Sequence, residues 1–166
     1  RVIRPGDIVS IDVGAAKDGY TGDNAGTFAA GTASPEAVRL MEATKESLRR
    51  AIAAAQPGNR IGDISYAVQS YIEEQGFSVV RKFVGHGVGR ELHEDPEVPN
   101  FGRAGRGVRL LPGMPLAIEP MVNAGDAQVK TLSNHWTVVT ADGKLSAHFE
   151  HSIAITSNGP VVLTSL

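Results

Sequence analysis

The sequence contains no cysteine, which excludes disulfide bridges, thiolate metal sites and a cysteine nucleophile. No apolar run approaches the ~20 residues that a membrane-crossing helix needs. The chain has 16 basic and 18 acidic residues and a formal net charge of −2, without the basic patch that binds nucleic acid. We therefore expect neither a membrane nor a nucleic-acid partner, and any metal ion must be bound through oxygen and imidazole.

The length and composition of the sequence are typical of one globular domain. With 166 residues, 42% hydrophobic and 20% charged, the chain is long enough to bury a single core. It begins Arg1-Val2-Ile3-Arg4, without an initiator methionine or a signal peptide. We expect residues 1–166 to form one domain of a longer protein, truncated at its amino-terminal side.

Local patterns predict a hairpin followed by two helices and further strands. Strands are expected at Ile8 to Val13 and near Thr27, joined by an Asp18-Gly19 turn. One helix should begin at Ser34-Pro35 and end at Pro57-Gly58, and a second should run from an Asn59 cap to Gly76. The later expected strands are 77–84, 116–118, 130–132, 136–140 and 146–156. The Gly/Pro-rich stretch 85–107 shows no periodicity and favours a functional loop.

Two segments of the chain repeat one pattern. Pro5-Gly6 precedes Asp12 at the same spacing as Pro112-Gly113 precedes Glu119, and each copy places an acid at the end of an apolar strand. Two related halves would bring these two acids together.

Acids beside apolar strand residues are costly to bury unless they are paired or bound to metal. Asp12, Glu119 and Glu150 all have such neighbours, and the predicted hairpin returns Asp23 towards Asp12. Few basic residues lie near them in the sequence. Two divalent cations would balance the four carboxylates, so the pattern favours a dinuclear site.

Histidines offer the nitrogen ligands. His86 lies between glycines and is the best candidate, with His93 second. An oxygen-rich set with one imidazole suits manganese, iron or cobalt better than a closed structural zinc site. The other histidines, His135, His148 and His151, are expected at the surface or at the edge of the core. Taken alone, Trp136 is typical of a core residue.

The chain resembles the bacterial type I methionine aminopeptidases, which share the pita-bread fold with Xaa-Pro peptidases and creatinase. The motifs that carry the resemblance are Ile11-Asp12-Val13, Gly22-Asp23, Gly85-His86-Gly87-Val88-Gly89, His93-Glu94-Asp95-Pro96, Ile118-Glu119-Pro120-Met121 and Glu150-His151. It implies an α/β (α+β) pita-bread fold, with a curved antiparallel sheet, helices on its outer face and pseudo-two-fold halves.

The same resemblance implies a role for each metal-binding residue. Asp12 would chelate one ion, Asp23 and Glu150 would bridge two ions, and His86 with Glu119 would complete the second site. The ions would be divalent cobalt, manganese or iron, with zinc as a further candidate. The implied reaction is removal of an amino-terminal methionine by attack of a metal-bound hydroxide on the peptide carbonyl.

Further roles follow from the resemblance. Glu119 would shuttle the proton, His93 would contact the substrate, and Leu92 and Trp136 would wall the methionine pocket. The implied protein is a cytoplasmic monomer that acts on nascent polypeptides and can associate with ribosomes.

Two alternatives stay open, an Xaa-Pro aminopeptidase or prolidase-like peptidase and a non-catalytic, truncated binding domain. Glu119-Pro120-Met121-Val122 favours the methionine class. The chain departs from the resembled pattern at Asn24, where a hydroxyl residue is more usual, and at His148, where glutamine is common. We expect neither of these residues to contact a metal ligand.

Overall fold

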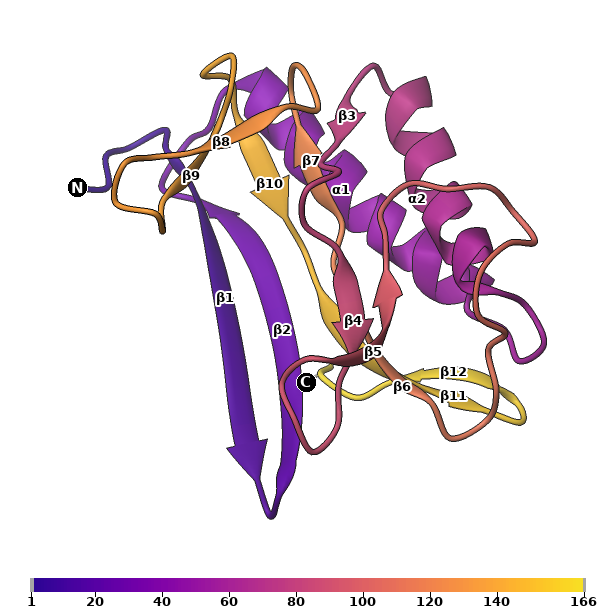
Figure 1. Ribbon diagram of the computed structural model, residues 1–166. Coiled ribbons are helices and arrows are strands. Elements are labelled where there is room, and N and C mark those ends of the chain that lie inside the picture. Colours follow the sequence, from indigo (N-terminus) through magenta and orange to yellow (C-terminus); the bar gives the residue numbers. More distant parts are fainter. Residues whose placement is uncertain (1, 166) are drawn as a thin grey trace.

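The computed structural model describes residues 2–165, which form two helices and a set of antiparallel strands (Figure 1). In chain order the elements are β1 (Ile8–Lys17), β2 (Tyr20–Ala29), α1 (Pro35–Ala54), α2 (Ile61–Glu74), β3 (Ser78–Val79), β4 (Gly85–Gly87), β5 (Glu94–Val98), β6 (Pro115–Ile118), β7 (Met121–Asn123), β8 (Val129–Thr131), β9 (Val138–Thr140), β10 (Ser146–His148), β11 (His151–Thr156) and β12 (Gly159–Val162). Within the described part of the chain, no helix has the length and apolar character that a bilayer crossing requires.

The β1–β2 hairpin confirms the predicted Asp18-Gly19 turn. Both turn residues have positive φ angles, 53° and 78°, as a type I′ turn requires. The register pairs Asp12 with Ala25 and Gly14 with Asp23. Asp12 and Asp23 are therefore diagonal neighbours on one face of the hairpin.

Helix α1 begins as the sequence predicts. The Ser34 hydroxyl accepts a hydrogen bond of 3.2 Å from the Ala37 amide, and Pro35 occupies the first turn, where it sacrifices no helical hydrogen bond. The helix ends at Ala54, shortly before Pro57.

Helix α2 is capped by Arg60, and the prediction of Asn59 as its cap is wrong. The Arg60 amide donates to the Asp63 carboxylate at 2.7 Å, within the first turn of the helix. The Asn59 side-chain amide instead donates to the Ala54 carbonyl at 2.9 Å and so closes the preceding helix.

The antiparallel strands are divided among several sheets. The largest has the order β12-β11-β6-β4-β5, and a second has the order β10-β7-β3. Strands β4 and β5 of the largest sheet lie in the stretch 85–107, where the sequence favours a loop. A Cβ on Gly85 would collide with the Ala117 carbonyl, and one on Gly87 with the Asp95 carbonyl. These two glycines let β4 pass between β5 and β6, and this places His86 inside the sheet.

Other predicted strands are shorter than expected. The stretch 77–84 contains only β3, and 136–140 contains only β9, so Trp136 precedes the strand. The predicted strand 146–156 is interrupted between β10 and β11 at Phe149 and Glu150.

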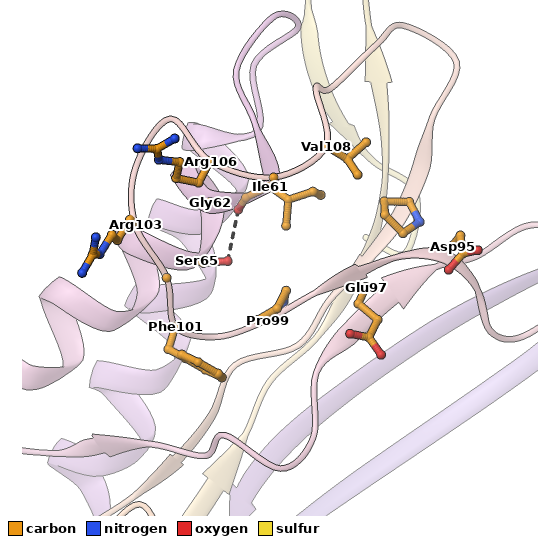
Figure 2. Close-up of a pocket in the computed structure, with 13 residues that line it drawn as sticks. Ile61, Gly62, Ser65, Asp95, Glu97, Pro99, Phe101, Arg103, Arg106 and Val108 are labelled. Carbon is orange, nitrogen blue, oxygen red and sulfur yellow. Dashed lines mark hydrogen bonds between the residues drawn. The ribbon is translucent and has the colours of Figure 1, made fainter.

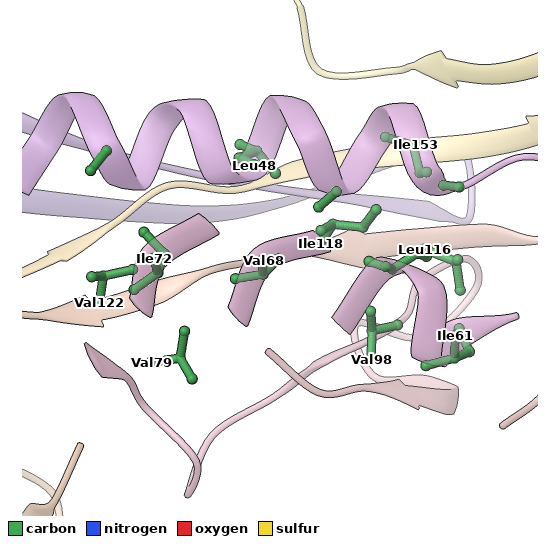
Figure 3. Packing of buried hydrophobic residues seen from close by; sticks show 14 of the residues in the cluster. Leu48, Ile61, Val68, Ile72, Val79, Val98, Leu116, Ile118, Val122 and Ile153 are labelled. Atoms are coloured by element: carbon green, nitrogen blue, oxygen red, sulfur yellow. The ribbon is translucent and has the colours of Figure 1, made fainter. Parts of the chain in front are cut away.

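The hydrophobic core lies between the two helices and the strands (Figure 3). Ile72 of α2 lies at the end of this cluster near Val122 of β7, and Ile61 lies at the other end near Leu116 of β6. Glu119 follows Ile118 directly, so β6 leads from the core to the carboxylate cluster described next. The repeated Pro-Gly turns also match, since Gly6 has a φ of 95° and Gly113 a φ of 97°.

Candidate metal centre

Acids and histidines from distant parts of the chain converge beside the hairpin. Asp23, His86 and Glu150 can each offer a ligand atom, all within 4.8 Å of one another. Asp12, His148 and Glu150 form a second group by the same measure. Glu150 belongs to both groups and is only 2% exposed. Two overlapping groups that share one carboxylate have the arrangement needed for two neighbouring ions.

Glu119 adjoins the first of these groups. Its Oε1 atom lies 3.4 Å from His86 Nε2, and that nitrogen lies 3.7 Å from Asp23 Oδ2. His86 Nδ1 is 2.8 Å from the Gly87 carbonyl oxygen, which can only accept a hydrogen bond, so Nδ1 donates the proton. The lone pair of His86 Nε2 therefore faces the carboxylates, as metal coordination requires. The Asn100 side chain donates to the Glu119 carbonyl at 3.1 Å.

Backbone contacts hold the cluster in place. The Ser152 hydroxyl accepts from the Asp23 amide at 2.8 Å and donates to the Asp23 carbonyl at 2.9 Å. The Glu150 amide donates to the Ala25 carbonyl at 2.9 Å. These bonds join β2 to the segment around β11, so the acids are positioned before any ion binds.

Burial and mutual repulsion hold protons on the buried acids. Burial, with repulsion from Asp12 and Asp23, raises the pKa of Glu119 to about 8. Burial, with repulsion from Glu119 and both aspartates, raises the pKa of Glu150 to about 9. The pKa of Asp23 is also raised, by burial and then by Asp12. Divalent cations would offset this repulsion, and the oxygen and imidazole donors fit such ions.

His148 contradicts the expectation that it lies apart from the ligands. Its Nε2 atom is 3.6 Å from Glu119 Oε2, and a nitrogen of the same ring belongs to the group with Asp12 and Glu150. Burial lowers the pKa of His148 to about 4, so the ring is neutral near pH 7. A sequence signal existed, because residues two apart in an extended segment point to the same side, and His148 precedes Glu150 by two.

The other two histidines lie outside these groups. His135 is exposed, and the His151 ring is half-buried and bonded through Nδ1 to the Thr164 hydroxyl at 2.9 Å.

The three residues expected to contact substrate, His93, Leu92 and Trp136, differ from one another in their surroundings. The rings of His93 and His86 have centroids 4.2 Å apart, so His93 borders the cluster. Leu92 packs against Gly14, where an added Cβ would lie 3.1 Å from a Leu92 methyl group. Trp136 is 88% exposed in the β8–β9 connection, so the interpretation as a core residue is wrong. Its place in a methionine pocket stays a prediction.

Two hollows border β5 and share Asp95 and Glu97 in their linings. One is lined by His86 and His93 together with Asp95 and Glu97, and so opens beside the cluster. The other is lined by α2 and the segment after β5, with Ile61, Phe101 and Val108 among its residues (Figure 2). None of the residues in the two ligand groups lines this second hollow.

Antiparallel strands that gather carboxylates and imidazoles around a shared glutamate have the arrangement of a metal-dependent hydrolase. Residues 1–157 match the sequence profile described as metallopeptidase family M24. The chain belongs to this family.

Known proteins are similar to this chain in sequence and in structure over nearly its whole length. Methionine aminopeptidase 1 of Bacillus subtilis is 56% identical over 164 residues, covering 99% of this chain and 66% of the relative. The crystal structure of a methionine aminopeptidase from Thermotoga maritima has a TM-score of 0.98 at 51% identity, covering 100% of this chain and 67% of that one. The chain thus spans about two thirds of the length of the curated relatives that it matches.

The fold expected from the resemblance is confirmed as the pita-bread fold of this family. An Xaa-Pro dipeptidase from Bacillus anthracis shares the fold with a TM-score of 0.79, at 27% identity, covering 100% of this chain and 41% of that one. Proteins named methionine aminopeptidase and Xaa-Pro dipeptidase therefore both have this fold.

Proposed function

We propose that this protein is a metal-dependent aminopeptidase that removes the amino-terminal methionine from nascent polypeptides. The observation that carries the proposal is the pair of ligand groups that share Glu150, in a chain 56% identical to a protein named methionine aminopeptidase. The proposed setting is the cytoplasm, with the protein acting as a monomer that can associate with ribosomes.

The ions would be held by Asp12, Asp23, His86, Glu119 and Glu150. Cobalt, manganese or iron fits this oxygen-rich set, with zinc as a further candidate. When bound, two divalent ions supply Lewis-acid polarisation of the peptide carbonyl and activation of water.

The residues of the chain would position the substrate and move the proton. Glu119 is mostly buried beside His86, where its Oε atoms can take up a proton and return it to the leaving amine. His93 lines the hollow beside His86 and can donate a hydrogen bond to the substrate carbonyl. Leu92 and Trp136 offer apolar surface for the methionine side chain.

An Xaa-Pro peptidase is the second enzymatic candidate, because the Bacillus anthracis dipeptidase has the same fold. The segment Glu119-Pro120-Met121-Val122 and the higher identity to methionine aminopeptidases favour the methionine class. Hydrolysis of Met-Ala-Ser and of an Ala-Pro peptide should be compared on the metal-loaded protein. We expect Met-Ala-Ser to be cleaved faster, and faster cleavage of the Ala-Pro peptide would overturn the assignment.

Replacing Asp23 tests the site itself. We expect Asp23→Ala to lower methionyl-peptide hydrolysis by about a thousandfold or more, because metal activation contributes several kcal/mol to the barrier. Asp126→Ala is the matched control, since Asp126 is exposed and uses only its backbone in hydrogen bonds.

Undiminished hydrolysis by Asp23→Ala would refute the proposed site. Metal binding without turnover by the unchanged protein would instead support a non-catalytic binding domain.

A further inference from the structure

His148 presents an unpartnered nitrogen to the carboxylates. Its Nε2 atom is buried and has no hydrogen-bond partner among the described residues. Glu119 Oε2 lies 3.6 Å from this nitrogen, which exceeds the length of a hydrogen bond. A buried ring nitrogen without a partner costs free energy, so its position calls for a ligand.

The backbone of His148 is fixed on both sides. The Thr27 hydroxyl accepts from the His148 amide at 2.9 Å and donates to the His148 carbonyl at 2.8 Å. The Ser10 hydroxyl lies 2.8 Å from the same Thr27 oxygen and completes the chain of hydrogen bonds. Residues of the hairpin that carries Asp12 and Asp23 thus position the backbone of His148.

The acids around the His148 ring are metal ligands in kind, and they lie close to the spacing that a shared ion requires. Asp12 and Glu150 offer carboxylate oxygens that lie within 4.8 Å of a ring nitrogen of His148 and of each other. Ligands bound at about 2.1 Å to one ion stand about 3 to 4 Å apart. A histidine that merely fills the core would not hold its ring nitrogens among the carboxylates of Asp12, Glu119 and Glu150.

We propose that His148 Nε2 is a ligand of the ion held by Asp12 and Glu150. The inference rests on the proposed dinuclear centre and adds one imidazole to it. His86 then serves the ion beside Asp23 and His148 serves the ion beside Asp12, so each ion has its own imidazole. Two imidazoles make the centre richer in nitrogen than the set expected from the sequence.

This second imidazole should change the preference among metals. Imidazole strengthens binding of zinc and cobalt more than binding of manganese, whose preferred ligands are oxygens. The unchanged protein should therefore select zinc or cobalt over manganese more strongly at the Asp12 side than a variant without the ring.

Calorimetric titration of the full chain with manganese and, separately, cobalt tests the assignment through binding alone. The variant is His148→Gln, which keeps much of the side-chain volume, and the matched control is His151→Gln. His151 lies outside both ligand groups and bonds to Thr164. We expect His148→Gln to weaken one of the two cobalt sites at least about tenfold, with a smaller effect on manganese. The control should bind both ions as the unchanged protein does.

X-ray absorption of the cobalt-loaded, unchanged protein gives a readout that needs no variant. Scattering from imidazole rings should show two rings for two ions. Two bound ions with a single ring, or unchanged cobalt affinity in His148→Gln, would overturn the assignment and leave the proposed function standing. Failure of the unchanged protein to bind two ions would overturn both.

Discussion

The helix-packed core and the carboxylate cluster differ in what their residues gain from burial, although the two regions meet on one strand. Ile118 of β6 is buried among apolar side chains, and Glu119, the next residue, enters the cluster. Burial stabilises the first residue by removing apolar surface from water. For the second, burial raises the pKa to about 8 and disfavours the charged form.

Burial therefore stabilises the helix-packed core, whereas it costs free energy in the carboxylate cluster. The cluster keeps its acids close together through bonds such as those from Ser152 to Asp23. Repulsion among the acids is then available to be offset when cations bind. Changes in the core should affect stability, and changes in the cluster should affect metal binding.

The largest effect on stability is expected in the core. Ile72→Ala should lower the free energy of unfolding by about 2 to 5 kcal/mol, because Ile72 is fully buried and its loss leaves a cavity. Urea unfolding measures this change. The number of ions bound per folded chain should stay the same.

Val38→Ala is the matched control, since Val38 lies exposed on α1. We expect a change within about 0.5 kcal/mol. A lowered metal count in folded Ile72→Ala would show that core and cluster are not separable in the way described.

A smaller effect is expected from pH on the metal-free protein. The folded pKa values of Glu119 and Glu150, about 8 and about 9, exceed the ordinary value of 4.5, so the folded state holds protons that the unfolded state has released. Stability should therefore fall as pH rises from about 6.5 to 8.5, by on the order of one to three kcal/mol. Below about pH 6.5 the lowered pKa of His148 acts in the opposite direction, because the unfolded state takes up a proton there.

Urea unfolding in the presence of a chelator measures this decline. Saturating manganese should abolish it, because bound cations favour the ionised carboxylates. Stability of the metal-free protein that stays constant or rises between pH 6.5 and 8.5 would contradict the account of the cluster.

The start of α1 and the hairpin turn could be predicted from the sequence, because both depend on neighbouring residues. Ser34 and Pro35 mark the start of α1, and Asp18-Gly19 marks the hairpin turn, because caps and turns depend on neighbouring residues. The convergence of Asp12, Asp23 and Glu150 also follows from a sequence argument about the cost of isolated buried acids.

Elements and contacts that depend on residues far apart in the chain cannot be predicted from local sequence patterns. Strand β4 reads Gly-His-Gly and β5 contains Pro96, so neither has the alternation of a strand. Strand β4 exists through its pairing with β5 and β6, and β5 through its pairing with β4. The prediction of His148 as peripheral is wrong because only its spacing of two residues from Glu150 points to the cluster in the sequence. Its surroundings come from Thr27 and Glu119, which lie far away along the chain.

The central claim is that these side chains together hold two divalent ions through a shared glutamate. The most direct measurement is the number of manganese or cobalt ions bound per chain by the unchanged protein and by Glu150→Gln. Since Glu150 belongs to both ligand groups, we predict two ions for the unchanged protein and weakened binding of both in the variant. Full retention of two tightly bound ions by Glu150→Gln would contradict the account.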